Sequence, residues 1–210
     1  EQGNICDLML ESGEKITGDF FIDATGFRAL LIEKLLKTPY ESWQHWLKCD
    51  SAIAIPCSVI KPLKAFTHST AHKAGWQWRI PLQHRVGNGM VFSSQYVSRE
   101  EALSDLLSNI EAEPLAEPRH FSFIPGMREN QWSHNCVALG LAGGFLEPLE
   151  STSIYLIQFA IQKLIEYFPV STDFSFSKKE FNKQLQDEYR RIRDFIIMHY
   201  AENQRQDSVF

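Results

Sequence analysis

Residues 76–81 read Trp76-Gln77-Trp78-Arg79-Ile80-Pro81. Alternate side chains of a β-strand point to the same face, so Trp76, Trp78 and Ile80 would form a continuous apolar wall, with the two polar residues on the opposite face. Pro81 has no backbone N–H to donate and is expected to end the strand. The spacing alone favours a sheet face that packs on a core.

The composition of the chain limits its class before any other motif is considered. With 210 residues, of which 44% are hydrophobic, the chain can bury one sizeable core, or a core with a helical lobe. The formal net charge of −5, with no basic stripe, argues against a nucleic-acid partner. No apolar run is long enough to span a bilayer and the first residues do not resemble a signal peptide, so we expect a cytoplasmic protein.

The cysteines indicate neither disulfides nor a metal centre. They are scattered along the chain and form no Cys-x-x-Cys pair: Cys6, Cys49, Cys57 and Cys136. We therefore expect four free thiols in a reducing compartment and no zinc site.

The chain has two regions of different pattern. Residues 1–150 are rich in β-prone segments separated by polar turns, among which we read Gly87-Asn88-Gly89 as turn punctuation. Residues 151–210 are helical in pattern. We therefore expect a mixed α/β fold with a boundary near residue 150.

Three helix starts can be read from capping signals. The sequences Ser98-Arg99-Glu100-Glu101 and Ser177-Lys178-Lys179-Glu180 have the form of capping boxes. Ser151 or Thr152 is expected to cap a third helix, which runs to Phe168 and has apolar residues nearly all round. Such a helix should be buried.

The first site candidate is the segment that feeds this third helix. Gly143 and Gly144 would let a flat ring or a phosphate approach the backbone. The free N–H groups and the dipole of a helix N-terminus attract anions. Glu147 and Glu150 lie close to that terminus, either as acids that complement the dipole or as a catalytic base; the residues alone leave both readings open.

The second site candidate is the strand end Asp23-Ala24-Thr25-Gly26, which leads through a turn into a helical stretch. Gly26 allows a tight turn and the close approach of a ligand. Asp23 could contact that ligand or simply cap the strand end.

Three motifs in this order resemble the flavin-dependent halogenases, the family that includes the tryptophan halogenases. They are the Asp-Ala-Thr-Gly segment, the W-x-W-x-I-P hexapeptide, and a form of F-x-x-P-x-x-S-x-G. The last stands here as Phe145, Pro148 and Ser151, with Ser153 in place of the final glycine. The resemblance covers residues 20–168 and 193–210.

The resemblance implies an α/β fold of the flavin monooxygenase type, with a mostly antiparallel central sheet followed by a helical C-terminal lobe. Residues 1–150 would be a partial FAD and substrate domain. The implied activity is that of an oxidoreductase in which FADH₂, supplied by a separate flavin reductase, and O₂ oxidise chloride or bromide to hypohalous acid. This oxidant passes through a tunnel to a lysine and halogenates a tryptophan or an indole-like arene.

The resemblance also implies roles for individual residues. Glu150 would be the catalytic glutamate, and the halide would bind at Thr152 and Ser153. Cofactor contacts would come from four residues: Asp23, Gly26, Gly143 and Gly144. The tunnel and its barrier would be lined by seven: Trp76, Trp78, Ile80, Pro81, Phe145, Pro148 and Ser151. The substrate would meet three: Tyr200, Gln206 and Phe210.

Two departures from the family pattern limit what this chain can do alone. It carries no Gly-x-Gly-x-x-Gly fingerprint after a first strand, and none of its lysines stands in the family's active-site motif. We therefore expect a C-terminal part that neither binds FAD tightly nor halogenates by itself, with exposed apolar edges that could support a homodimer. The alternatives are a flavin-dependent aromatic monooxygenase of the same fold and a non-catalytic interaction module.

Overall fold

The computed structural model describes residues 3–169 and 173–208, which form a mixed α/β structure. The chain divides into two compact units, each made of two chain segments. The first unit comprises residues 1–42 and 126–196, and the second comprises residues 43–125 and 197–210. Antiparallel sheets with a helical C-terminal region confirm the expected fold class. The boundary near residue 150 stays a prediction.

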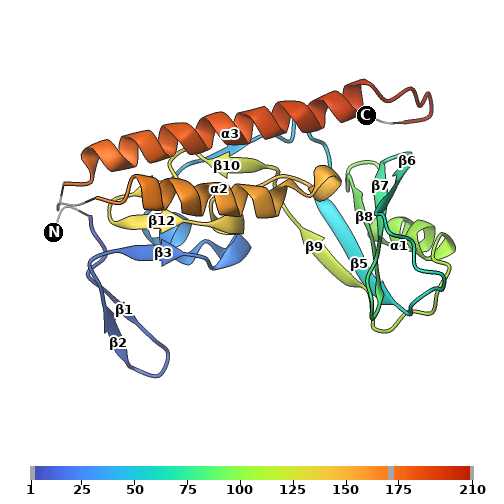
Figure 1. Ribbon diagram of the computed structural model, residues 1–210, viewed down its shortest axis with the longest axis horizontal. Helices are drawn as coiled ribbons and strands as arrows, with labels where there is room; N and C mark the ends of the chain where they lie inside the picture. The colour runs from blue at the N-terminus through green and yellow to red at the C-terminus, as the bar shows by residue number, and fades with distance from the viewer. Residues whose placement is uncertain (1–2, 170–172, 209–210) are drawn as a thin grey trace. The chain divides into compact units, whose positions relative to one another are not determined.

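The first unit contains a hairpin and two small sheets. The hairpin pairs β1 (Asp7–Met9) with β2 (Lys15–Thr17), shown in dark blue in Figure 1. In one three-stranded sheet, β12 (Cys136–Ala138) runs antiparallel to β11 (Trp132–Ser133) and parallel to β3 (Phe21–Asp23). In the other, β10 (Gly126–Arg128) is central between β4 (Tyr40–Ser42) and β13 (Gly144–Phe145).

Short turns of 3₁₀- and π-helix connect these strands. They are η1 (Gly26–Arg28), the π-helix η2 (Leu30–Leu35), η3 (Gly140–Ala142) and η4 (Pro148–Glu150). After β3, where the sequence suggested one helical stretch, the chain forms two such turns, η1 and η2. Residues 132–138 form two short antiparallel strands, β11 and β12, because the chain turns at His134 with φ of 51°.

Two helices pack on the first unit. Helix α3 (Ser175–Ala201) is fixed to β11 through Asn182, whose amide bonds both backbone groups of Trp132 at 2.8 and 2.9 Å. Helix α2 (Thr152–Glu166) lies beside α3, and the Tyr155 hydroxyl donates to Glu188 at 2.7 Å (Figure 1).

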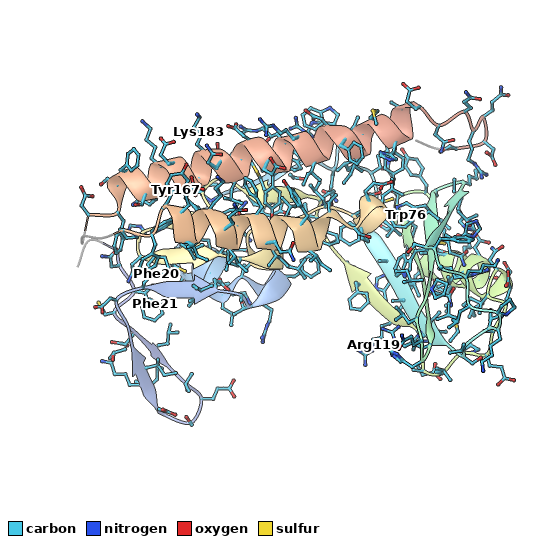
Figure 2. The ribbon with its side chains drawn as sticks, viewed as in Figure 1. Phe20, Phe21, Trp76, Arg119, Tyr167 and Lys183 are labelled. Carbon is cyan, nitrogen blue, oxygen red and sulfur yellow. The ribbon has the colours of Figure 1, made fainter. Side chains whose placement is uncertain are left out.

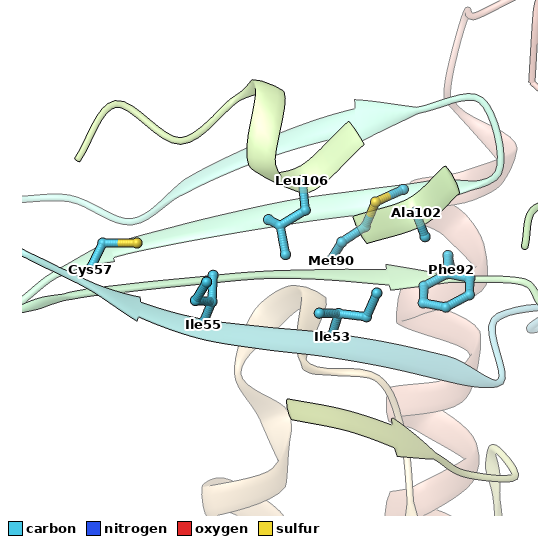
Figure 3. Packing of buried hydrophobic residues seen from close by; sticks show 7 residues of the cluster. All are labelled: Ile53, Ile55, Cys57, Met90, Phe92, Ala102 and Leu106. Carbon is cyan, nitrogen blue, oxygen red and sulfur yellow. The ribbon is translucent and has the colours of Figure 1, made fainter. Parts of the chain in front are cut away.

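The second unit is a five-stranded antiparallel sheet, covered on one face by α1 (Arg99–Ser108). The strand order is β6 (His68–His72), β7 (Gly75–Pro81), β8 (Val86–Phe92), β5 (Ser51–Cys57) and β9 (Arg119–Ser122). Figure 3 shows its core, in which Ile53, Met90 and Phe92 pack against Ala102 and Leu106 of α1.

Of the three predicted helix starts, those of α1 and α2 lie where the sequence placed them, whereas that of α3 does not. At α1 both bonds of the capping box form: Ser98 Oγ accepts from the N–H of Glu101, and Glu101 Oε2 accepts from the N–H of Ser98. The box at Ser177 is wrong, because α3 already begins at Ser175 and the carboxylate of Asp173 accepts from the Ser175 N–H at 2.9 Å.

Two further expectations are corrected by the fold. Gly87-Asn88-Gly89 is not a turn but lies inside β8, paired with β7 and β5. Helix α2 buries Leu156, Ala160 and Leu164 but exposes other apolar residues, with Ile154 68% and Ile165 73% exposed. The prediction of a buried helix is therefore wrong within this chain.

Candidate active site

A parallel strand pair brings the two glycine-containing segments of the first unit together. Strands β3 and β12 run in the same direction, with Asp23 opposite Ala138, and the N–H of Leu139 donates to the Asp23 carbonyl at 3.0 Å. The turns η1 and η3 follow these two strands and contact each other. The carboxyl ends of parallel strands are where ligands bind in open α/β sheets. This edge is therefore the first place to test for a cofactor.

Asp23 is fully buried, and both of its carboxylate oxygens are engaged by its own chain. Oδ1 accepts from the N–H and hydroxyl of Thr25 at 3.0 and 2.6 Å, and Oδ2 accepts from the N–H groups of Leu31 and Ile32, each at 2.8 Å. Burial by itself would raise the pKa of Asp23, but these hydrogen bonds outweigh it and lower the pKa below its ordinary value. The ionised carboxylate thus fixes the turn and the start of η2.

The three glycines expected to admit a ligand differ in the space beside them. Gly26 has φ of +68°, and no atom of the described residues lies within 4 Å of the position that a Cβ would take. At Gly143 a Cβ would lie 2.6 Å from Gln131 Oε1, and at Gly144 it would lie 2.7 Å from the Gly126 carbonyl oxygen. At 144 the backbone of Gly126 and Met127 leaves no room for a side chain, whereas at 143 the nearest atoms belong to the end of the Gln131 side chain. Gly26 leaves an open approach.

Helix α2 begins without a side-chain cap. Ser151 holds the N-cap position in the left-handed conformation, with φ of 57°, and its side chain makes no capping bond, so the prediction that it caps this helix is wrong. Its N–H instead closes η4 by donating to the Pro148 carbonyl at 3.1 Å. The hydroxyl of Thr152 is buried and has no hydrogen-bond partner within the part of the chain that the structure describes. Ser153, next along the helix, is half-buried.

The two glutamates of this loop have opposite environments. Glu147 is fully buried, whereas Glu150 is exposed at the end of η4, immediately before Ser151. An exposed carboxylate can exchange protons with solvent or with a ligand, so Glu150 has the accessibility that a base requires.

Phe27 belongs to the same edge and was missed in the sequence. Its ring meets that of Phe145 edge-on, with centroids 5.2 Å apart and an interplanar angle of 76°, and Phe27 remains 45% exposed. A large aromatic residue directly after a glycine turn was the available signal.

In the second unit the tryptophans of β7 share one face, as predicted. The ring centroids of Trp76 and Trp78 lie 5.9 Å apart, and β7 ends at Pro81. Ile80 continues the same face toward Pro81. The side chain of Trp76 is labelled in Figure 2. It is buried, with 4% of its surface exposed.

The α1 core lies on the opposite face of the sheet. Cross-strand pairing places Gln77 opposite Met90, a member of that core, so the tryptophans point to the other side. Arg79, on the α1 side, donates to Glu111 Oε1 at 2.8 Å and to the Asn109 carbonyl at 3.1 Å. The face formed by Trp76 and Trp78 is therefore not the face of the sheet that packs on the α1 core.

The C-terminal segment expected to meet the substrate runs beside β6 of the same unit. The hydroxyl of Tyr200 lies 3.7 Å from Cys49 Sγ. Arg205 donates to the carbonyl of Ala71, the residue opposite Trp76 in β6, at 2.7 Å, and Gln206 is exposed next to it. Phe210 lies outside the described residues.

Metal and membrane signals are also tested by the structure. Within residues 3–169 and 173–208 no group of three or more His, Cys, Asp or Glu side chains could hold a metal ion. None of the helices in this range combines the length and apolar composition that crossing a bilayer requires. Cys6 is exposed and the other three cysteines are buried, all as free thiols.

Solved structures identify the class of protein that has this fold. The chain is 47% identical to Xcc4156, a flavin-dependent halogenase from Xanthomonas campestris, with a TM-score of 0.95 over 99% of this chain and 42% of that one. It is 46% identical to BrvH, a flavin-dependent halogenase from Brevundimonas sp. BAL3, with a TM-score of 0.93 over 97% of this chain and 42% of that one. The fold is therefore that of the flavin-dependent halogenases.

The family follows from sequence comparison. The tryptophan halogenase family model matches residues 1–210, and the chain belongs to this family. A curated relative, the 7-chloro-L-tryptophan 6-halogenase KtzR from Kutzneria sp. (strain 744), is 39% identical over 95% of this chain and 39% of its own length. The chain thus spans about two fifths of the relatives it matches. The family match favours a halogenase over the monooxygenase alternative.

Proposed function

We propose that the full-length protein containing this chain is a flavin-dependent halogenase that oxidises chloride or bromide and transfers the halogen to an electron-rich arene. The observation that carries the proposal is the uncapped start of α2. Its first N–H groups, the unused buried hydroxyl of Thr152 and the exposed carboxylate of Glu150 lie within three consecutive positions of the chain. An anion site directly beside an accessible base suits this chemistry.

The halide is proposed to bind at the N–H groups of Thr152 and Ser153. Helix N-terminal N–H groups lack intrahelical acceptors, and the helix dipole favours negative charge there. The Thr152 hydroxyl is a further donor, with no hydrogen-bond partner among residues 3–169 and 173–208. Ser153 keeps the backbone N–H of the family's glycine, and its side chain makes the site narrower, which should favour the smaller halide.

The flavin is proposed to lie at the carboxyl edge of β3 and β12. Gly26 fits this role, because its Cβ side is open and its positive φ exposes the turn. Asp23 holds the turn in place through its four internal hydrogen bonds. Gly143 and Gly144 are proposed as further cofactor contacts, and they pack closely against Gln131 and Gly126. When bound and reduced by a separate flavin reductase, FAD supplies the oxidising chemistry with O₂.

Glu150 is proposed as the catalytic carboxylate of this chain. It can hold a hydrogen bond to the halogenating species, or accept the proton that the arene loses when the halogen is added. Its position at the end of η4 leaves the Glu150 side chain exposed.

The substrate is proposed to be an indole-containing arene, either tryptophan or a smaller indole. In the second unit, the Trp76/Trp78 face and the segment with Tyr200 and Gln206 lie close together through the Arg205–Ala71 contact. Sequence identity to these relatives does not single out tryptophan as the substrate. KtzR, whose name includes a tryptophan substrate, is 39% identical to this chain, whereas Xcc4156 and BrvH, named only as flavin-dependent halogenases, are 46–47% identical. The wall of Trp76, Trp78, Ile80 and Pro81 is proposed as part of the tunnel barrier, together with Phe145, Pro148 and Ser151.

The assignment of Glu150 is tested by Glu150→Gln in the full-length protein. Loss of a catalytic acid–base group should lower the halogenation rate by about 10²-fold or more, with little change in thermal unfolding. Glu166→Gln, at the far end of α2 and also exposed, is the matched control and should retain full activity. A Glu150→Gln enzyme with wild-type turnover would refute the role.

A further inference from the structure

One glycine of the second unit lies in direct contact with the Trp wall. Trp78 and Gly89 are cross-strand partners in β7 and β8, on the face that the tryptophans occupy. A Cβ at residue 89 would lie 2.0 Å from Cζ2 and 2.2 Å from Cη2 of Trp78. The indole therefore fills the volume that any side chain at this position would need.

A second glycine on the same strand provides the comparison. Gly87 lies on the same face, opposite Ile80, two residues before Gly89. A Cβ there would meet Arg85 Nη1 at 3.4 Å and the Ile80 carbonyl oxygen at 3.8 Å, which are ordinary contacts. Of these two glycines, only Gly89 is required to lack a side chain by the ring of a wall tryptophan.

We propose that Gly89 is a positioning residue of the Trp wall, whose bare backbone lets the Trp78 indole lie against β8 beside Trp76. The inference rests on the proposed function, because the wall is taken as the barrier that confines the oxidant. Trp76 and Trp78 then keep a ring separation of 5.9 Å. A side chain at residue 89 displaces the Trp78 ring from the strand and breaks the continuity of the wall, so Gly89 controls how completely the oxidant is retained.

The geometry of the wall can be measured in the full-length protein without any turnover. Two indoles this close give an exciton-coupled circular dichroism signal, which Trp78→Phe should abolish. Gly89→Ala should reduce the amplitude at least twofold, while Gly87→Ala should leave it unchanged. Equal spectra for the two alanine variants would overturn the proposal.

A double-mutant cycle separates the Trp78 contact from a second one. A Cβ at residue 89 would also lie 2.5 Å from the Ile53 carbonyl oxygen, so Gly89→Ala strains the β5–β8 pairing as well. That strain is common to both backgrounds and cancels when Gly89→Ala is compared with and without Trp78→Ala. The proposal predicts that Gly89→Ala shifts the unfolding equilibrium constant about fivefold less when Trp78 is absent. An equal shift, or failure of the double variant to fold, would mean that β5 rather than Trp78 fixes this position and would overturn the proposal.

The consequence for the reaction is measured in the full-length protein with reduced FAD, bromide and indole. Gly89→Ala should lower the fraction of consumed reduced FAD that is recovered as bromoindole severalfold, and Gly87→Ala should not. An unchanged recovery with an altered indole signal would overturn the part of the proposal that links Gly89 to oxidant retention. If the wild-type protein forms no bromoindole at all, the proposed function fails, and the optical and stability measurements still decide whether Gly89 positions Trp78.

Discussion

Asp23 is the residue whose chemistry the structure defines most fully. Four hydrogen bonds converge on a carboxylate that is completely buried, and they come from a hydroxyl and three backbone N–H groups within nine positions along the chain. A buried carboxylate with all of these donors in place is stable as the anion. Its first role is therefore to hold the turn that contains Gly26.

Replacing Asp23 by Asn should destabilise the chain by about 2 kcal/mol at neutral pH, because an amide NH₂ would face backbone donors that now meet a carboxylate oxygen. The folded-state pKa is lowered, so the stabilisation is present above the unfolded pKa of about 3.9 and is lost as the pH falls through the folded value. Denaturant unfolding of both proteins between neutral and acidic pH measures this. A gap that stays constant down to the lowest pH would contradict the assignment.

Some features of the candidate site could be predicted from the sequence at the level of single residues, and others could not. The strand-end position of Asp23 and the open turn at Gly26 follow from residue types alone. Two of the donors to Asp23, the N–H groups of Leu31 and Ile32, do not, because they lie in a π-helical turn that no periodicity indicates. Gly89 was read as turn punctuation, since the indole that requires it comes from another strand.

At the scale of elements, the helix starts show where capping rules hold. Ser98 and Glu101 satisfy each other at the start of α1, so this box acts as the sequence predicted. At α3 the carboxylate of Asp173 accepts the Ser175 N–H two residues before the expected Ser177 cap. At α2 the left-handed Ser151 leaves the terminus uncapped. Capping signals locate a helix start only when nothing upstream competes.

Ser98→Ala should therefore lower the free energy of unfolding by about 1 kcal/mol, through loss of the bond to the Glu101 N–H. Ser104→Ala, exposed in the middle of the same helix, is the control and should be neutral or slightly stabilising, since Ala is the better helix former. Chemical denaturation monitored by circular dichroism measures both. Equal effects of the two substitutions would mean that the capping box contributes nothing.

At the scale of the whole molecule, the chain is organised into two units that are each assembled from distant segments. The antiparallel sheet of the second unit could be anticipated from its strand pattern. The parallel pairing of β3 with β12, more than a hundred residues apart, could not, because no local pattern specifies which strands meet. The edge that carries the candidate flavin contacts depends on this pairing.

The exposed apolar residues of α2 should make the 210-residue chain self-associate, since contiguous apolar surface of this kind promotes association. The double variant Ile161→Lys/Ile165→Lys should shift the chain toward the monomer in analytical ultracentrifugation. Gln162→Lys adds a similar charge at an exposed polar position of the same helix and should change the distribution less. A wild-type chain that is monomeric at all concentrations would contradict this prediction.

The proposed activity of the protein that contains this chain is halogenation of an arene with a flavin-derived oxidant. Mass analysis of the products formed from indole, bromide, O₂ and reduced FAD by the full-length protein tests it most directly. Bromoindole is the expected product, formed only when bromide is present. Hydroxyindole as the product, or indole recovered unchanged while reduced FAD is consumed, would contradict it.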